Sequence, residues 1–171
     1  MLSEKTKNSI IELQKLYPIK RSALIPALHL AQAELGYLSS ETQNEVAELF
    51  GIDPNEVNGV VTFYDMFFEK PTGKHLIHVC KNISCMLRGG DQVIEKLCHK
   101  LKVSPEERTA DGYFTVIVSE CLGACDKAPV MLVDDQVVGP VKLEDLNYYL
   151  ENAKKGPGHP SPVEKIEAQH G

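Results

Sequence analysis

Four of the five cysteines in this chain stand in two short pairs, and each pair follows an apolar run with the composition of a β-strand. The pairs are Cys80 with Cys85 and Cys121 with Cys125, and the runs before them are residues 75–79 and 113–119. Loops at the ends of two strands that are adjacent in one sheet can lie side by side. If the two runs are adjacent strands of one sheet, the four thiols therefore meet at its edge.

Converging thiols in this pattern admit three kinds of site. Four thiolates hold a [2Fe–2S] cluster, one pair on each iron, and the short loops here have small or flexible residues that turn backbone N–H groups toward such an anion. Four cysteines also bind structural zinc, although its pairs are usually spaced C-x2-C. A redox-active dithiol would use C-x-x-C, and Cys121 and Cys125 have one residue more between them. The spacing favours the iron–sulfur cluster and leaves zinc and dithiol sites open.

Several residues near the pairs have a structural interpretation beside a functional one. Cys98 lies beside the apolar face of a predicted helix and is interpreted as a small buried hydrophobe. His75 and His78 lie inside the predicted strand and not in the loops, so we expect structural roles and not Rieske-type ligation. The remaining charged candidates are Lys81, Arg88 and Lys127, which offset cluster charge, meet an acidic partner or are ordinary surface charges. The remaining apolar candidates are Ile83, Met86 and Leu122, which would keep water from the cluster.

The net charge and the apolar runs of the sequence indicate the compartment of the chain, and the compartment indicates the chemistry of its cysteines. The net charge of −6, with no long basic run, argues against nucleic acid as the main partner. The first residues lack the apolar stretch of a signal peptide, and no run approaches the roughly 20 apolar residues of a membrane span. We therefore expect a soluble chain in a reducing compartment, the cytoplasm, where metal or redox chemistry explains cysteines better than disulfides do.

The predicted fold is of the α+β class and has three regions. Residues 1–70 read as a bundle of short helices, with Ser3, Ser22, Ser40 and Asp53 as N-caps and Gly36 and Gly51 as helix ends. Residues 71–152 have the order β-α-β-β-β-α, which predicts a mixed sheet flanked by helices. Within this region, the last three elements are a hairpin around Asp134-Asp135 and a helix over 141–150. Residues 153–171 are rich in Pro and Gly and predict a flexible tail.

The order of several motifs resembles one known family. They are Tyr17-Pro18, the stretch 24–32, Gly36-Tyr37-Leu38, Gly59-Val60-Val61-Thr62-Phe63-Tyr64, Cys80 through Gly89 with its pair of cysteines, Cys121-Leu122-Gly123-Ala124-Cys125 and Ala128-Pro129-Val130. Over about residues 10 to 150 the chain is similar to the thioredoxin-like [2Fe–2S] subunit of the NADH dehydrogenase module of respiratory complex I, the 24 kDa family. No ligand position departs from that pattern.

The resemblance implies a helical N-terminal region followed by a thioredoxin-like [2Fe–2S] ferredoxin domain. It implies that Cys80 and Cys85 hold one iron and Cys121 and Cys125 the other. The implied partner is a 51 kDa-type flavoprotein that binds NADH and FMN, within the peripheral arm of a membrane-associated complex, and the cluster would exchange single electrons with that FMN. The chain has no G-x-G-x-x-G and no P-loop, so we expect no nucleotide site and no catalytic residue of its own.

Other functions stay open beside this one. The same type of small iron–sulfur protein serves NAD-linked hydrogenases and formate dehydrogenases, which differ in their other subunits. From different classes, a free-standing thiol oxidoreductase and a zinc-stabilised interaction module also remain. The aromatic run at residues 63–68 is a candidate for much of the partner surface, or for simple interdomain packing. A location in the mitochondrial matrix would apply only if a transit peptide had been removed.

Overall fold

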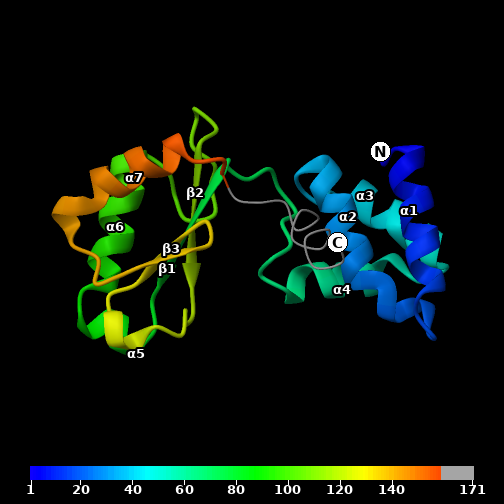
Figure 1. Cartoon of the computed structure of the whole chain (residues 1–171), viewed down its shortest axis with the longest axis horizontal. Coiled ribbons are helices and arrows are strands. Elements are labelled where there is room, and N and C mark those ends of the chain that lie inside the picture. Colours follow the sequence, from blue (N-terminus) through cyan, green and yellow to red (C-terminus); the bar gives the residue numbers. More distant parts are fainter. Residues whose placement is uncertain (159–171) are drawn as a thin grey trace. The chain divides into compact units, whose positions relative to one another are not determined.

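The computed structural model describes residues 1–158, which divide into two compact units (Figure 1). The first unit is Met1–Pro71 and the second begins at Thr72. None of the helices within residues 1–158 is both long enough and apolar enough to cross a bilayer.

The first unit is built from helices. They are α1 (Glu4–Lys15), the 3-10 helix η1 (Lys20–Ala23), α2 (Leu24–Leu35), α3 (Ser40–Phe50) and α4 (Pro54–Phe63). One buried cluster joins them, with Ile10, Leu28, Val46 and Val57 all fully buried. Each of these four α-helices contributes an apolar face to this cluster, as the periodicity predicts.

Half of the predicted N-caps are confirmed. Ser3 accepts a hydrogen bond from the Thr6 N–H, and Asp53 accepts one from the Asn55 N–H. The caps at Ser22 and Ser40 are wrong. Ser22 lies inside η1, and α2 follows with no side-chain cap.

The start of α3 shows why the cap moves by one residue. Ser39, not Ser40, accepts from the Thr42 N–H. This register buries Gln43, whose side-chain amide donates to the Leu38 carbonyl at 2.9 Å. Satisfying the buried backbone carbonyl outweighs the local capping box that the sequence suggests.

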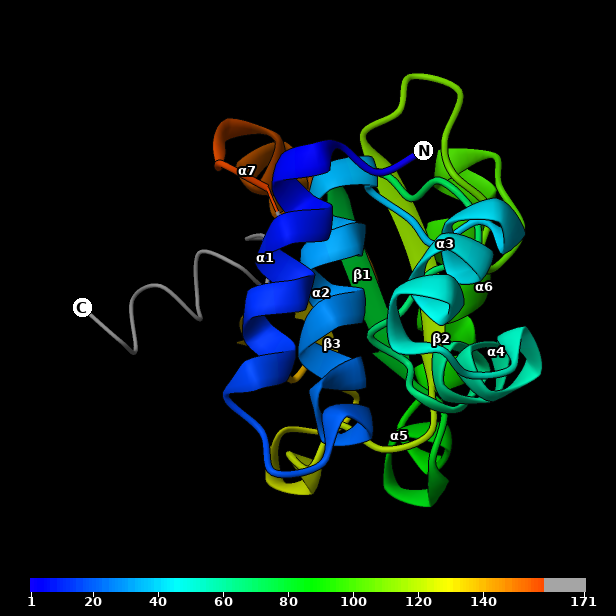
Figure 2. The same cartoon turned by 90° about the vertical axis from the view of Figure 1, so that its right-hand side faces the viewer.

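The second unit contains a four-stranded mixed sheet (Figure 2). Its strands are β1 (His75–Cys80), β2 (Phe114–Ser119), β3 (Met131–Val133) and β4 (Gln136–Val138), in the spatial order β2-β1-β3-β4. β1 runs parallel to β2 and antiparallel to β3, and β3 and β4 form the predicted hairpin. The predicted α+β class is confirmed.

Helices complete the second unit. They are α5 (Ile83–Leu87), α6 (Gly90–Leu101), the 3-10 helices η2 (Cys125–Lys127) and η3 (Leu143–Asp145), and α7 (Leu146–Lys155). α6 and α7 cover the same face of the sheet (Figure 1), because Val93 and Leu146 share one buried cluster with Ile77 and Val79 of β1. This packing fixes β1 between two strands and beneath two helices.

Several elements differ from the sequence prediction. α5 replaces the irregular loop that the sequence predicts after Cys80. The final helix begins as η3 and ends at Lys155, so residues 153–155 of the predicted tail are helical. Residues 159–171 of that tail lie outside the described residues. β1 runs one residue further than predicted and includes Cys80 itself.

Candidate metal centre

The pairing of β1 with β2 brings the two cysteine loops together, as predicted, and the structure shows this pairing to be parallel. Cys80 is the last residue of β1 and pairs with Ser119, the last residue of β2. The Lys81 N–H donates to the Ser119 carbonyl at 3.0 Å, and the Cys80 thiol donates to the Glu120 carbonyl at 3.5 Å. Cys121 follows two positions after Ser119, so it leaves the sheet beside Cys80.

The first pair of cysteines is buried. Cys80 is 3% exposed and Cys85 is 2% exposed. The Cys80 N–H donates to the Val130 carbonyl at 3.1 Å, which ties Cys80 to the segment before β3. Cys85 lies on the inner side of α5, whose N-cap is Asn82 with its side chain accepting from the Ile83 N–H.

The second pair is exposed. Cys121 and Cys125 both have exposed side chains. Gly123, between them, has φ of +72°, a left-handed conformation that a side chain would strain. Cys125 begins η2, where the Lys127 N–H donates to the Ala124 carbonyl at 3.0 Å. The two halves of the site therefore differ: the first is enclosed by the chain and the second faces outward.

Cys80 interacts with thiols of both pairs. Burial alone would raise its pKa, because it disfavours the thiolate. Hydrogen bonds from the Asn82 and Leu122 backbone N–H groups and from the Cys85 and Cys121 thiols outweigh burial and lower the pKa of Cys80. Residues of both cysteine loops thus influence the pKa of Cys80.

Cys85 is affected in the opposite direction. Burial raises the pKa of Cys85, and its hydrogen bond with Cys80 and the nearby charges of Cys80 and Cys125 raise it further. Through Cys80 and Cys85, all four predicted cysteines belong to one electrostatically connected group. All four are free thiols.

Apolar side chains surround the buried half of the site. Cys80 and Cys85 form one cluster with Ala128 and Val130, and Leu122 packs against it. That Ile83 and Met86 also keep water from the cluster stays a prediction. Their side chains are 67% and 47% exposed, because α5 turns its inner side, with Cys85, toward the sheet.

One predicted charge near the cysteines is paired. Lys81 forms an ion pair with Glu120 at 2.8 Å, and the hydrogen bond and negative charge of Glu120 raise the pKa of Lys81. The positive charge is thus offset beside the cysteine loop.

The histidines have structural positions, as expected, whereas Cys98 is only half-buried and not the fully buried hydrophobe that the sequence predicts. Cys98 packs against the core of the second unit, and burial raises its pKa. His75 is fully buried, with Nδ1 at 2.9 Å from an Asp134 carboxylate oxygen. His78 Nδ1 lies at 3.0 Å from the Ser119 hydroxyl.

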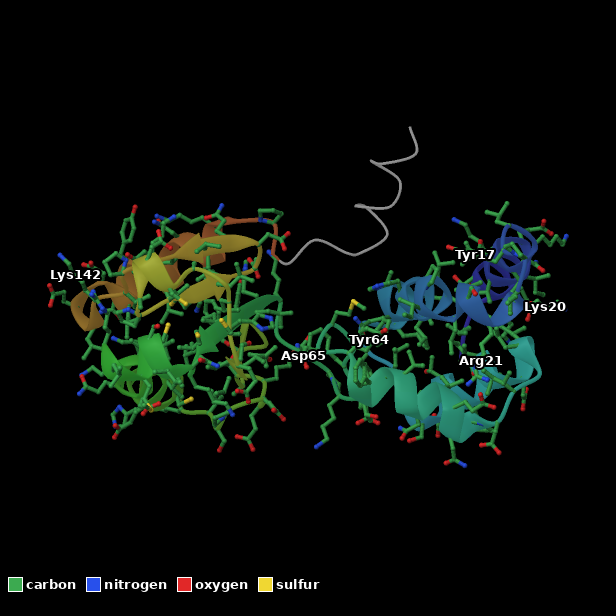
Figure 3. The ribbon with its side chains drawn as sticks, turned by 90° about the horizontal axis from the view of Figure 1, so that it is seen from below. Tyr17, Lys20, Arg21, Tyr64, Asp65 and Lys142 are labelled. Atoms are coloured by element: carbon green, nitrogen blue, oxygen red, sulfur yellow. The ribbon has the colours of Figure 1, made fainter. Side chains whose placement is uncertain are left out.

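The aromatic run at residues 63–68 is only partly a surface. Phe63 is 75% exposed, but Phe67 is 6% exposed and Tyr64 packs against the same core. Tyr64 and Asp65 lie where the chain leaves α4 (Figure 3). Part of the expected partner surface is therefore core of the first unit.

The residues present fit a [2Fe–2S] cluster. Within residues 1–158, no three His, Cys, Asp or Glu side chains gather closely enough to hold one metal ion between them. A [2Fe–2S] cluster takes four thiolates in all, shared between its two irons. The chain supplies two pairs of free thiols, on loops that leave the paired ends of β1 and β2.

Two cysteine pairs at the ends of paired strands in a mixed sheet are an arrangement that small iron–sulfur proteins can use. The chain belongs to the thioredoxin-like [2Fe–2S] ferredoxin family, whose sequence model matches residues 10–154. The predicted family and the predicted cofactor, a [2Fe–2S] cluster, are thereby confirmed.

Two relatives share most of their length with this chain. The E 2 subunit of NADH-quinone oxidoreductase from Rhizobium meliloti is 40% identical over 136 residues, which is 80% of this chain and 81% of the relative. The E subunit of NADH-quinone oxidoreductase from Pseudomonas aeruginosa is 35% identical over 151 residues, 88% of this chain and 91% of the relative.

A solved structure has a similar fold. The crystal structure of an NAD+-reducing [NiFe]-hydrogenase in its air-oxidized state matches with a TM-score of 0.64 and 25% sequence identity. The match covers 77% of this chain but 23% of the hydrogenase chain, so this chain spans less than a quarter of it.

Sequence reasoning missed α5 as an element of the site. Asn82 is the signal that could have found it, because an Asn before Ile83 through Leu87 is a typical N-cap ahead of apolar residues. Five residues are too few for a helical period to be visible. The position of Cys85 within the site depends on this short helix.

Proposed function

We propose that this chain is the electron-transfer subunit of an NADH-quinone oxidoreductase and that Cys80, Cys85, Cys121 and Cys125 are the ligands of its [2Fe–2S] cluster. The observation that carries the assignment is the pairing of Cys80 with Ser119, which brings both cysteine loops to the same end of the sheet. Relatives that match over most of their length are E subunits of such complexes, which supports this choice of parent complex.

The pairs divide the cluster between them in this proposal. Cys80 and Cys85 hold one iron, and Cys121 and Cys125 hold the other. When bound, the cluster accepts and returns single electrons. The N–H groups of Asn82 and Leu122 stabilise negative charge on the Cys80 sulfur, and the apolar residues around the first pair keep water from it.

The proposed partner is a flavoprotein that binds NADH and FMN. It would approach the exposed pair, Cys121 and Cys125, because electron transfer needs a short distance and the chain covers this side of the site least. The chain itself would have no bond-making active site. Its place would be the peripheral arm of the complex on the cytoplasmic side.

The direct test is an EPR spectrum of the anaerobically purified full chain before and after dithionite, with iron and zinc measured on the same sample. The proposal expects two irons per chain and a signal from one unpaired electron that appears only on reduction. A sample with one zinc, or with no metal and a cycling disulfide, would contradict it.

Two variants test the ligand set in the same experiment. Cys85→Ala removes a thiol from the connected group and is expected to lose the cluster or to hold it poorly. Cys98→Ala is the matched control, because Cys98 packs against the core of the second unit and belongs to neither pair. Loss of the signal in Cys98→Ala, with retention in Cys85→Ala, would reverse the assignment.

A hydrogenase is the second candidate for the parent complex, favoured by the structural match to an NAD+-reducing [NiFe]-hydrogenase. The two are separated by purifying the native complex through this chain and measuring its nickel content and its subunits. Nickel in proportion to this chain would favour the hydrogenase. Quinone reduction by NADH without nickel would favour the NADH-quinone oxidoreductase.

A further inference from the structure

Gly90, the first residue of α6, lies directly against the backbone of both cysteines of the first pair. A Cβ atom built on Gly90 would lie 2.9 Å from the Cys85 carbonyl oxygen and 3.0 Å from the Cys80 carbonyl oxygen. It would also lie 3.0 Å from the Cys85 carbonyl carbon. These neighbours are backbone atoms, so no side chain can rotate away, and any residue other than glycine would push the backbone apart.

α6 cannot yield to such a contact. Val93 and Leu97 are buried in the core of the second unit, one and two turns into the helix. They pack in the same cluster as Ile77 and Val79 of β1. Moving the start of α6 outward would open this core, which close packing resists.

Cys80 is also held firmly. It is the last residue of β1, its N–H donates to the Val130 carbonyl at 3.1 Å, and it pairs with Ser119 of β2. Hydrogen bonds on both sides of the strand therefore fix the Cys80 backbone.

Cys85 is the partner that can move. α5 is only five residues long, and Ile83, Met86 and Leu87 on it are exposed. Short helices have little stability of their own. A methyl group at Gly90 would therefore displace Cys85 and leave Cys80 in place.

We propose that Gly90 is a positioning residue that sets the separation of Cys80 and Cys85. The inference rests on the proposed function, because the two thiols must be spaced to hold one iron. Gly90 acts through the cysteine backbone, because the atoms nearest to its Cβ position belong to the Cys80 and Cys85 carbonyl groups. Displacing atoms that orient a metal's ligands typically weakens metal binding about 10- to 100-fold.

The test compares Gly90→Ala with Gly73→Ala in the full chain. Gly73 is the matched control, since its Cβ would lie 2.6 Å from the Phe114 backbone nitrogen and Cα, before the other end of β1. Both variants strain the same sheet, but only Gly90→Ala does so beside the cysteines. The measurements are iron loss to a chelator, the EPR g values and reduction potential of the reduced chain, and circular dichroism of the metal-free chain.

Gly90→Ala is expected to lose iron about 10 to 100 times faster than the unchanged chain and to shift the g values and potential. Its metal-free form is expected to keep native secondary structure, because Ala favours helix more than Gly does. Gly73→Ala is expected to melt at a lower temperature but to keep the g values of the unchanged chain.

Three results overturn the inference. In the first, Gly90→Ala holds iron as firmly as the unchanged chain and gives the same g values. In the second, Gly90→Ala and Gly73→Ala change the g values to the same extent. In the third, metal-free Gly90→Ala is unfolded, which would make Gly90 a requirement of folding and not of ligand position. If the unchanged chain binds no two-iron cluster, the proposed function fails as well, and that result is visible before any variant is compared.

Discussion

The side chain of Asp134 stabilises the start of β1, and its removal should destabilise the second unit. Asp134 lies in the turn between β3 and β4, and one carboxylate oxygen accepts the Leu76 N–H at 2.9 Å. The other oxygen lies 2.9 Å from Nδ1 of the fully buried His75. Asp134 also has φ of +52°, a conformation that Asp and Asn tolerate better than Ala.

The loss in the free energy of unfolding that we expect for Asp134→Ala is the sum of three contributions. Two buried donors, the Leu76 N–H and the His75 ring, lose their acceptor, at about 1 kcal/mol each or somewhat more. Placing Ala in the left-handed conformation adds about 1 kcal/mol. We therefore expect the free energy of unfolding to fall by about 3 kcal/mol. Asp134→Asn tolerates the turn and keeps an oxygen acceptor, so it should lose about half as much.

The assay is urea unfolding of the full chain followed by circular dichroism, with hydrogen exchange of the Leu76 amide as a local probe. The Leu76 amide should exchange much faster in Asp134→Ala and at an intermediate rate in Asp134→Asn. If the Ala variant unfolds within about 0.5 kcal/mol of the unchanged chain, the carboxylate does not stabilise β1. If Asn destabilises as strongly as Ala, the negative charge matters and not the acceptor geometry.

Two further predictions concern other parts of the fold. Gln32→Leu removes the amide that donates to the Met66 carbonyl at 2.8 Å and accepts from the Phe68 N–H at 2.8 Å. We therefore expect the free energy of unfolding, measured by thermal unfolding of the chain, to fall by about 2 kcal/mol. An unchanged melting temperature would contradict this prediction. Asp111 has a pKa lowered from 3.8 to about 2, by hydrogen bonds from Thr109 and the Tyr113 N–H and by Lys154. The ionised Asp111 carboxylate stabilises the folded chain fully above about pH 4, and this contribution is lost as the pH falls toward 2. Because the side chain is 49% exposed, the contribution amounts to less than about 1 kcal/mol. Acid unfolding of Asp111→Asn should lack this component, and an identical acid profile would refute it.

The meeting of the cysteines could be predicted from the sequence because it depends on topology alone. Two apolar runs that end in cysteine pairs need only be parallel neighbours, and the pairing of Cys80 with Ser119 is that arrangement. Helix ends marked by glycine, Gly36 and Gly51, could be predicted for a similar reason, since a left-handed residue is a local requirement. In both cases, the residues that form the cysteine loops or the helix ends themselves carry the sequence pattern that predicts them.

The features that sequence reasoning missed depend on neighbours distant in the chain. Ser39 replaces Ser40 as the cap of α3 because Gln43 has to reach the Leu38 carbonyl. In the sequence, Gly90 is an ordinary first residue of a helix. Only the structure shows that the carbonyl groups of Cys80 and Cys85 lie against it. Neither requirement is visible in the composition of the segment that carries it.

The two ends of β1 have different roles, one in the stability of the fold and the other in the cysteine site. His75 and Leu76 at its start depend on the Asp134 carboxylate, whereas Cys80 at its end belongs to the cysteine site. At about 3.3 Å per residue, five residues place these ends about 16 Å apart. Parallel and antiparallel neighbours hold the strand along its length. Asp134→Ala should therefore weaken the fold and leave the EPR g values of the cluster unchanged, whereas Gly90→Ala should change the g values in a chain that still folds. A shift in the g values of Asp134→Ala would show that strain does travel along β1, and the separation of fold from ligand position would then be wrong.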